Sequence, residues 1–170
     1  MKKIKALLYI AIVATTLSVA LISCTPDPCK DVVCQNGGTC LEGTCDCADG
    51  FVGTFCEGAL VGNYNVSENS FTTGASSYVS GYTVSGSNVQ ISNFWGTFVN
   101  KVNATVSGST ITIANQEPDS DHYFVSGSGT ITTDANNKVN IAYTYSVIKK
   151  DSTETTTLAT DNVTGTHIHN

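Results

Sequence analysis

The chain has 170 residues, of which 14 are acidic and 8 are lysine, with no arginine, and its formal net charge at pH 7 is −6. Three of the lysines lie within the first five residues, so the remainder carries 5 lysines against 14 acids. An acidic surface without arginine repels nucleic acid and anionic lipid headgroups, which excludes nucleic acid as a partner.

The chain begins with a positively charged segment, residues 1–5, and residues 6–22 then carry no charge. This run is short for a membrane span, which needs about 20 apolar residues, and is typical of a secretory signal. It ends in Leu-Ile-Ser-Cys at residues 21–24, which resembles the lipobox of bacterial lipoproteins. The resemblance implies a signal peptide at 1–23 and lipidation of Cys24. An ordinary secretory segment that ends near an unrelated cysteine is the alternative.

A lipid on Cys24 would make the membrane a partner of the protein. One acyl chain holds a protein only weakly, whereas two or three hold it firmly. Thr25 follows the cysteine in place of an aspartate, so nothing signals retention in an inner membrane. We therefore expect a cell-envelope protein anchored in the outer membrane, periplasmic or surface-exposed, with residues 24–28 as anchor and short stiff spacer.

The other six cysteines follow the spacing Cys-x4-Cys-x5-Cys-x4-Cys-x-Cys-x8-Cys between residues 29 and 56. This spacing, with Asn-Gly-Gly at 36–38 and Gly50-Phe51 before Gly53, resembles an EGF-like module, for which we set the bounds 28–57. Sequence alone allows fifteen pairings of six cysteines. The resemblance implies three of the possible disulfides, namely Cys29–Cys40, Cys34–Cys45 and Cys47–Cys56.

A module of about 30 residues cannot bury enough apolar surface to fold unaided, so it needs such cross-links. Disulfides persist only in an oxidising compartment, in agreement with export. A zinc site is the weaker alternative, because the region has no histidine and no Cys-x2-Cys pair. Calcium binding is also not expected, because Asp27 stands alone before the first cysteine and the 41–44 segment is too short for the rest of a calcium motif.

Residues 58–170 contain no cysteine and alternate apolar with polar residues at period two, which predicts a mainly β domain. The predicted strands are 60–67, 77–85, 88–94, 98–107, 109–115, 123–133, 138–148 and 154–169, the last as one strand or two. Short strands joined in sequence favour an antiparallel meander closed into a barrel, and a β-sandwich is the alternative. The pattern GNYNV…VQISNFWG…VNATVSGSTITIANQ…GSGTI resembles the lipocalin-like domains of Bacteroidota surface lipoproteins.

The sequence Val-Ser-Gly-Ser occurs three times, at 84–87, 106–109 and 125–128. The first two copies join alternating runs, which predicts tight hairpins. The third is expected within a strand, with residues 134–137 as the following turn.

Few residues suggest chemistry. No Gly-x-Ser-x-Gly motif occurs, so a serine hydrolase lacks support. His167 and His169 would share one face of a strand and could hold a metal with His122 or an acid, but a frayed polar C-terminus is the favoured interpretation. The acidic segment 116–123 is interpreted as a solvated turn instead of a calcium loop, because it lacks a glycine at the bend. We therefore expect no enzyme activity, no cofactor and no bound metal.

The aromatic residues carry the remaining hypothesis. Phe94, Trp95 and Phe98 are close in sequence, and Tyr143 and Tyr145 share a strand face. Core packing is the default interpretation of these residues. The leading functional hypothesis is an EGF-like module that presents a β-domain to a protein or glycan partner. The alternative is a lipocalin-like carrier of a small apolar ligand bound at Trp95, Tyr143 and Tyr145. Finally, residues 151–153, Asp-Ser-Thr, resemble an O-glycosylation sequon of some Bacteroidota, and chance is the alternative in a chain so rich in threonine.

Overall fold

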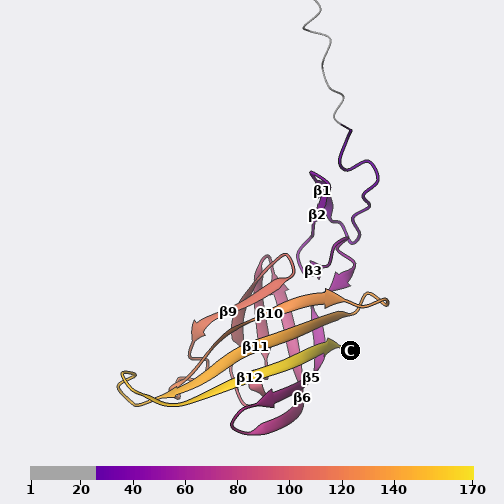
Figure 1. Cartoon of the computed structure of the whole chain (residues 1–170). Coiled ribbons are helices and arrows are strands. Elements are labelled where there is room, and N and C mark those ends of the chain that lie inside the picture. Colours follow the sequence, from indigo (N-terminus) through magenta and orange to yellow (C-terminus); the bar gives the residue numbers. More distant parts are fainter. Residues whose placement is uncertain (1–25) are drawn as a thin grey trace, which may run out of the picture.

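In the computed structural model, which describes residues 26–170, a small disulfide-bonded module stands on one end of a closed eight-stranded barrel (Figure 1). The predicted signal peptide and Cys24 lie outside the described residues. Within the described part, no helix has the length and apolar character needed to cross a bilayer. The mainly β class and the antiparallel barrel are confirmed.

The module contains two small antiparallel sheets. Strands β1 (Thr39–Leu41) and β2 (Thr44–Asp46) form a hairpin, and β3 (Phe51–Val52) pairs with β4 (Gly58–Ala59). The second sheet therefore crosses the expected boundary between residues 57 and 58. The three disulfides are those that the EGF-like resemblance implies, namely Cys29–Cys40, Cys34–Cys45 and Cys47–Cys56. A cross-linked module followed by a barrel fits the EGF-like and lipocalin-like architecture.

The barrel is an up-and-down meander in which each strand pairs antiparallel with the next and the last pairs with the first. Alternate side chains along each strand point into the barrel, as the period-two pattern predicts. The strands are β5 (Gly62–Ser70), β6 (Gly74–Ser85), β7 (Asn88–Ser92), β8 (Val102–Ser107), β9 (Thr110–Gln116), β10 (Tyr123–Thr133), β11 (Val139–Lys150) and β12 (Thr157–His169).

The three Val-Ser-Gly-Ser segments adopt the structures that the sequence predicts. The first two supply two-residue hairpin loops, with Ser85 opposite Asn88 and Ser107 opposite Thr110. Gly86 and Gly108 have φ values of 59° and 55°, which glycine adopts without steric cost. The third copy lies within β10, and a turn follows it. The final alternating run forms one strand, β12, and not two.

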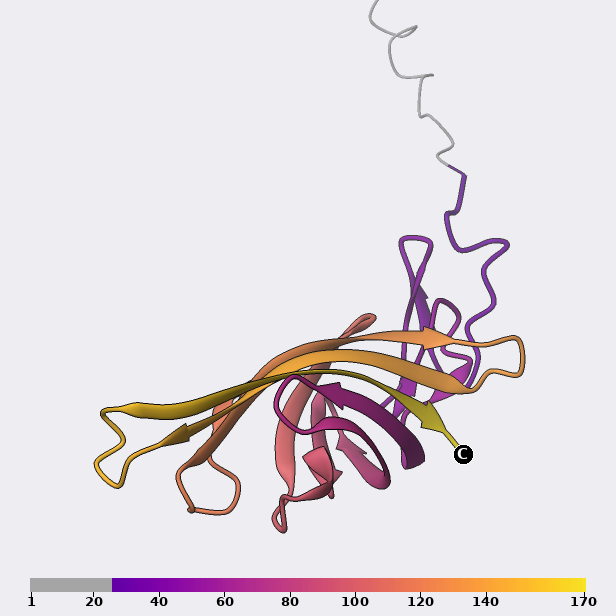
Figure 2. The ribbon, with the colours of Figure 1, turned by 60° about the horizontal axis from the view of Figure 1, so that its bottom comes forward.

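One predicted strand begins four residues too early. Residues 98–101 lie outside β8, and β7 ends at Ser92, two residues before the predicted end. The intervening segment contains the short 3-10 helix η1 (Phe94–Gly96), in which Trp95 has φ 60°. Because β7 runs away from the module, this segment lies at the far end of the barrel, as Figure 2 shows. The apolar residues of this segment alternate as in a strand, but Phe94 and Phe98 reach the core from a loop, so the alternation does not indicate a strand here.

Two glycines on β10 leave space in the core for the large side chains of β11. A Cβ on Gly127 would collide with Cα and Cβ of Tyr145, and one on Gly129 would lie 2.8 Å from Cγ2 of Ile141. Real Cβ atoms do not approach so closely, so β10 carries no side chain where β11 carries its largest. The bare backbone of β10 therefore allows the tyrosines of β11 to fill the barrel.

Candidate binding cleft and barrel core

The module is fixed to the barrel mouth by specific hydrogen bonds. Asp49 Oδ2 accepts a bond of 3.0 Å from the Gly86 backbone N–H in the β6–β7 loop. Thr133 Oγ1, at the end of β10, donates to Glu57 Oε1 at 2.7 Å. Burial alone would raise the pKa of Glu57, but the bonds from Thr133 and from backbone N–H groups outweigh it and hold the pKa below its ordinary value. The carboxylate form of Glu57 therefore favours docking.

Between the module and the barrel mouth lies a cleft of about 750 Å³. Residues 44–54 of the module form one wall, and the hairpin loops at 86–87 and 108–109 form the opposite rim. The floor is apolar and comes from both parts, with Val52 and the fully buried Leu60 meeting barrel side chains. The barrel contribution to this floor is Val84, Val106 and Ile131. A cleft with an apolar floor and a polar rim has the character of a binding site.

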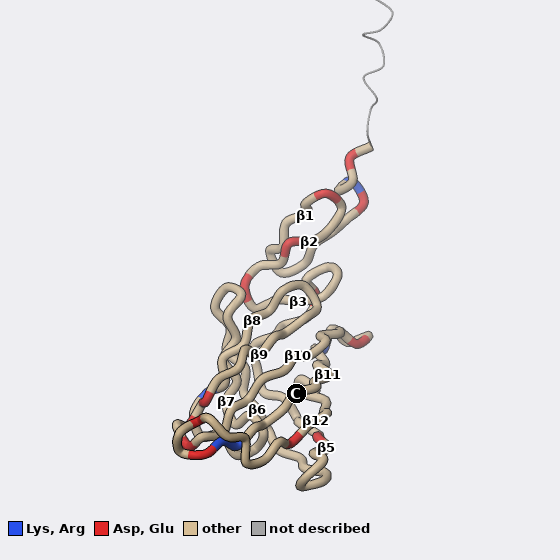
Figure 3. Tube along the Cα trace, turned by 60° about the vertical axis from the view of Figure 1, so that its left-hand side comes forward, with Lys and Arg blue, Asp and Glu red and all other residues tan. Residues whose placement is uncertain are grey.

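The charge of the cleft has one sign. Asp46 and Asp49 line it, and no lysine does, within the described chain. Both carboxylates belong to the module wall, and Figure 3 shows acidic residues along the module and again at the far end of the barrel. Side chains of one sign on a low-dielectric floor concentrate ligands of the opposite charge. The cleft is therefore suited to a cationic group attached to an apolar one.

The barrel core is polar at its centre. The Tyr145 hydroxyl donates to Glu68 Oε1 at 2.8 Å, and Glu68 is only 4% exposed. The same oxygen lies 3.4 Å from Nε2 of His167, whose Nδ1 is 2.7 Å from the Tyr82 hydroxyl. Tyr82 also donates to the Tyr143 hydroxyl at 3.2 Å. Burial raises the pKa of each of these tyrosines, so they remain protonated hydroxyls at neutral pH.

His167 corrects a sequence interpretation. The C-terminal residues are not a frayed polar tail, because β12 closes the barrel against β5 and His167 is fully buried. His169 shares its face, as predicted, and its Nε2 lies 3.1 Å from the Val61 carbonyl oxygen. His122 lies in the loop between β9 and β10, at the opposite end of the barrel, so the three histidines do not form one site.

The proposed ligand residues fall in two places. Tyr143 and Tyr145 are each 2% exposed and pack on Phe94, with ring centroids 5.7 and 4.7 Å away. Trp95 instead packs on Phe98 and on Tyr123 at the end of the barrel far from the module. The two tyrosines and Trp95 thus contact different neighbours. Binding of an apolar ligand at these residues stays a prediction.

Two other predicted segments lie at the far end. The acidic segment forms the loop between β9 and β10, as the solvated-turn interpretation expects. Asp151 begins the loop between β11 and β12, and its carboxylate oxygens accept bonds from Thr153 Oγ1 and the Thr155 backbone N–H. Hydrogen bonding, first from the Thr156 backbone, lowers the pKa of Asp151. Glycosylation of residues 151–153 stays a prediction.

The sequence reasoning missed the residues that line the cleft. Asp46 and Asp49 were not singled out, because the cleft exists only where the module meets the hairpin loops. Glu68 was also missed, although its signal was present: it is the one acid in the alternating run of β5, at a position of inward parity. A charged residue at an apolar parity position is a usable signal for a buried polar cluster.

Comparison of the chain with protein-family models, with curated proteins and with solved structures finds no match.

Proposed function

We propose that this chain is a lipid-anchored cell-envelope protein that binds a protein partner without catalysing a reaction, and that the cleft between module and barrel is its binding site. The observation that carries this proposal is the cleft itself, which two parts of the chain build together with an apolar floor and two carboxylates. The partner would insert a lysine or arginine beside an aliphatic side chain.

Several features support this assignment of the site. The loops at 86–87 and 108–109 present backbone and hydroxyl groups at the rim, where an extended peptide finds hydrogen-bond partners. The floor offers apolar contacts, and a desolvated aliphatic anchor supplies most of the binding energy in such sites. The cross-linked module and the hydrogen bonds of Asp49 and Glu57 keep the cleft open before the partner arrives, which lowers the cost of binding.

Selection from a random peptide library on the immobilised protein tests the proposal. We expect enriched peptides to contain lysine or arginine next to an aliphatic residue. The Asp46→Asn variant should bind a selected peptide about two- to fivefold more weakly, because one exposed ion pair is worth up to about 1 kcal/mol. Fluorescence anisotropy of the labelled peptide measures this loss, and raising the salt concentration should reduce it.

Glu42→Gln is the matched control for this experiment. Glu42 is an exposed carboxylate of the same module, in the turn between β1 and β2, and it lies outside the cleft. Its loss removes the same charge but should leave the peptide affinity unchanged. Equal weakening by both variants, or enrichment of peptides without a basic residue, would contradict the assignment. A Trp95 fluorescence change on addition of fatty acid would favour the carrier alternative.

The membrane location is tested separately. The Cys24→Ala chain lacks the thiol that would carry the lipid, so we expect it to leave the membrane fraction for the soluble envelope fraction. Fractionation of cells and immunoblotting measure this shift, and mass spectrometry of the N-terminal peptide identifies the lipid on the parent chain. A Cys24→Ala protein that still sediments with membranes would contradict the anchor and leave the cleft unaffected.

A further inference from the structure

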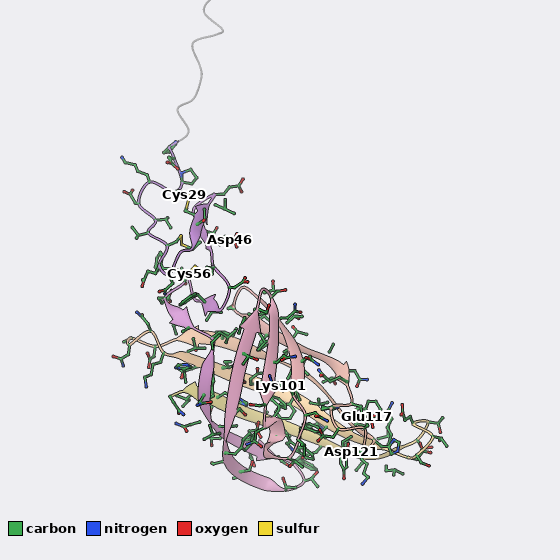
Figure 4. The ribbon with its side chains drawn as sticks, turned by 180° about the vertical axis from the view of Figure 1, so that it is seen from behind. Cys29, Asp46, Cys56, Lys101, Glu117 and Asp121 are labelled. Atoms are coloured by element: carbon green, nitrogen blue, oxygen red, sulfur yellow. A yellow bond between two sulfur atoms is a disulfide. The ribbon has the colours of Figure 1, made fainter. Side chains whose placement is uncertain are left out.

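A second cluster of chemically capable side chains lies at the end of the barrel far from the cleft. It consists of Glu117 and His122, from the loop between β9 and β10, and Glu154, from the loop between β11 and β12. Figure 4 shows Glu117 at this end, with Asp46 of the cleft at the other. The ligand atoms of the three side chains lie within 4.8 Å of one another.

The Nδ1 atom of His122 is close to both carboxylates but forms a hydrogen bond with neither. His122 Nδ1 lies 3.9 Å from Oε1 of Glu117 and 3.9 Å from Oε1 of Glu154. Both distances exceed the length of a hydrogen bond. Nδ1 itself is shielded from solvent, although the His122 side chain as a whole is partly exposed, and it has no hydrogen-bond partner in the described chain. A buried ring nitrogen that faces two carboxylates without a bond to either is a group that lacks its partner.

The two nearby lysines, Lys149 and Lys150, make contacts outside this cluster. Lys149 Nζ donates to the Tyr123 hydroxyl at 3.0 Å, and Lys150 Nζ lies 4.2 Å above the Phe124 ring. Among residues 26–170, neither lysine forms an ion pair with Glu117 or Glu154. Among the described residues, the two carboxylates therefore share only His122 as a basic partner, and its side chain is 38% exposed.

The two loops that hold these groups are linked. The Lys150 backbone N–H donates to the His122 carbonyl oxygen at 2.9 Å, which joins the end of β11 to the preceding loop. The backbone N–H of His122 donates to Glu117 Oε1 at 2.5 Å, and the backbone N–H of Glu154 donates to the Asp151 carbonyl oxygen at 2.9 Å. These bonds fix the backbone near each ligand, so little order has to be created when an ion binds.

We propose that Glu117, His122 and Glu154 bind one divalent transition-metal ion of the zinc type. One imidazole nitrogen and two carboxylate oxygens form a ligand set that suits zinc, whose bonds to them measure about 2.0–2.2 Å. Ligand atoms around such an ion are about 3.4 Å apart. The imidazole therefore needs to approach each carboxylate by about half an ångström, and every ligand atom already lies within 4.8 Å of the other two. The imidazole excludes calcium as the preferred ion, because calcium selects oxygen ligands.

Isothermal titration of the purified chain with zinc chloride, in a buffer without chelating groups, tests the site. We expect one ion per chain, a melting temperature several degrees higher with zinc than with a chelator, and a zinc-dependent shift of the His122 ring resonances in NMR spectra. Glu154→Gln keeps the shape of the side chain and should weaken zinc binding at least about tenfold. The same titration with calcium chloride should show much weaker binding.

Asp121→Asn is the control, because Asp121 lies in the same loop but outside the cluster, and an asparagine Oδ1 can still accept the bond from the Tyr123 backbone N–H. This variant should retain the affinity of the parent chain. Equal affinities of the Glu154→Gln and parent chains, the absence of a resonance shift at His122, or tighter binding of calcium would overturn the proposal.

Discussion

Replacement of Phe94 by alanine is expected to lower the free energy of unfolding by about 3–5 kcal/mol. Phe94 belongs to η1, yet its side chain is 0% exposed and contacts the rings of Tyr143, Tyr145 and His167. Truncation would remove these contacts and leave a cavity that the rigid strands cannot fill by collapsing. It would also open the end of the core to water, beside the buried hydroxyl groups of Tyr82, Tyr143 and Tyr145.

Chemical denaturation followed by circular dichroism measures this loss. Phe71→Ala is the matched control, because Phe71 lies in the loop between β5 and β6 and is 90% exposed. Its truncation should change the free energy of unfolding by less than about 0.5 kcal/mol. A loss for Phe94→Ala as small as the loss for Phe71→Ala would contradict the assignment of Phe94 to the core.

The second large effect is a loss of stability on mild acidification. His167 is buried, and desolvation lowers its pKa below the ordinary value of 6.5, although the nearby Glu68 partly opposes this shift. The folded chain therefore keeps His167 neutral at pH values where the unfolded chain binds a proton. Because the unfolded state then holds more protons, stability falls as the pH falls from 6.5 toward the lowered pKa, by up to about 1.4 kcal/mol per pH unit.

Denaturation curves at pH 5, 6 and 7 measure this slope, over a range (about 5 to 7) that lies above the ordinary pKa of carboxyl groups. The groups that face His167 are Glu68 of β5, Tyr82 of β6 and Tyr143 of β11. His167→Gln should be less stable at pH 7 but should lose most of the slope. His169→Gln should retain the slope of the parent chain. A parent chain whose stability does not change over this range would contradict the assignment.

Most of the fold could be predicted because its signals are local. Period-two alternation placed all eight barrel strands, and the Ser-Gly pairs placed two hairpin loops within a residue or two. The errors occurred where a tertiary contact decides the conformation. Residues 98–101 alternate like a strand, but the burial of Phe94 draws this segment across the end of the barrel. A buried side chain can reach the core from a strand or from a loop, and no local sequence pattern separates these two cases.

The candidate sites were harder to predict, because each joins segments far apart in sequence. Asp46 and the loop at 108–109 lie on opposite walls of one cleft, and Glu117 meets Glu154 across two loops. Their proximity follows from the barrel register, which a single sequence does not specify. His167 was misinterpreted for a related reason. Its polar neighbours suggested an exposed tail, and only the pairing of β12 with β5 reveals that its face points inward.

That pairing also has a kinetic consequence. Val163 lies opposite Ser70, so the contact that seals the barrel joins residues almost a hundred positions apart. While the chain is being synthesised, one edge of β5 stays unpaired until β12 has been made. Contacts of such long range slow folding, because a large loop must close before they form. A chain whose barrel closes late stays unfolded for longer, and this delay would favour the export proposed above, because a translocation channel accepts an unfolded chain.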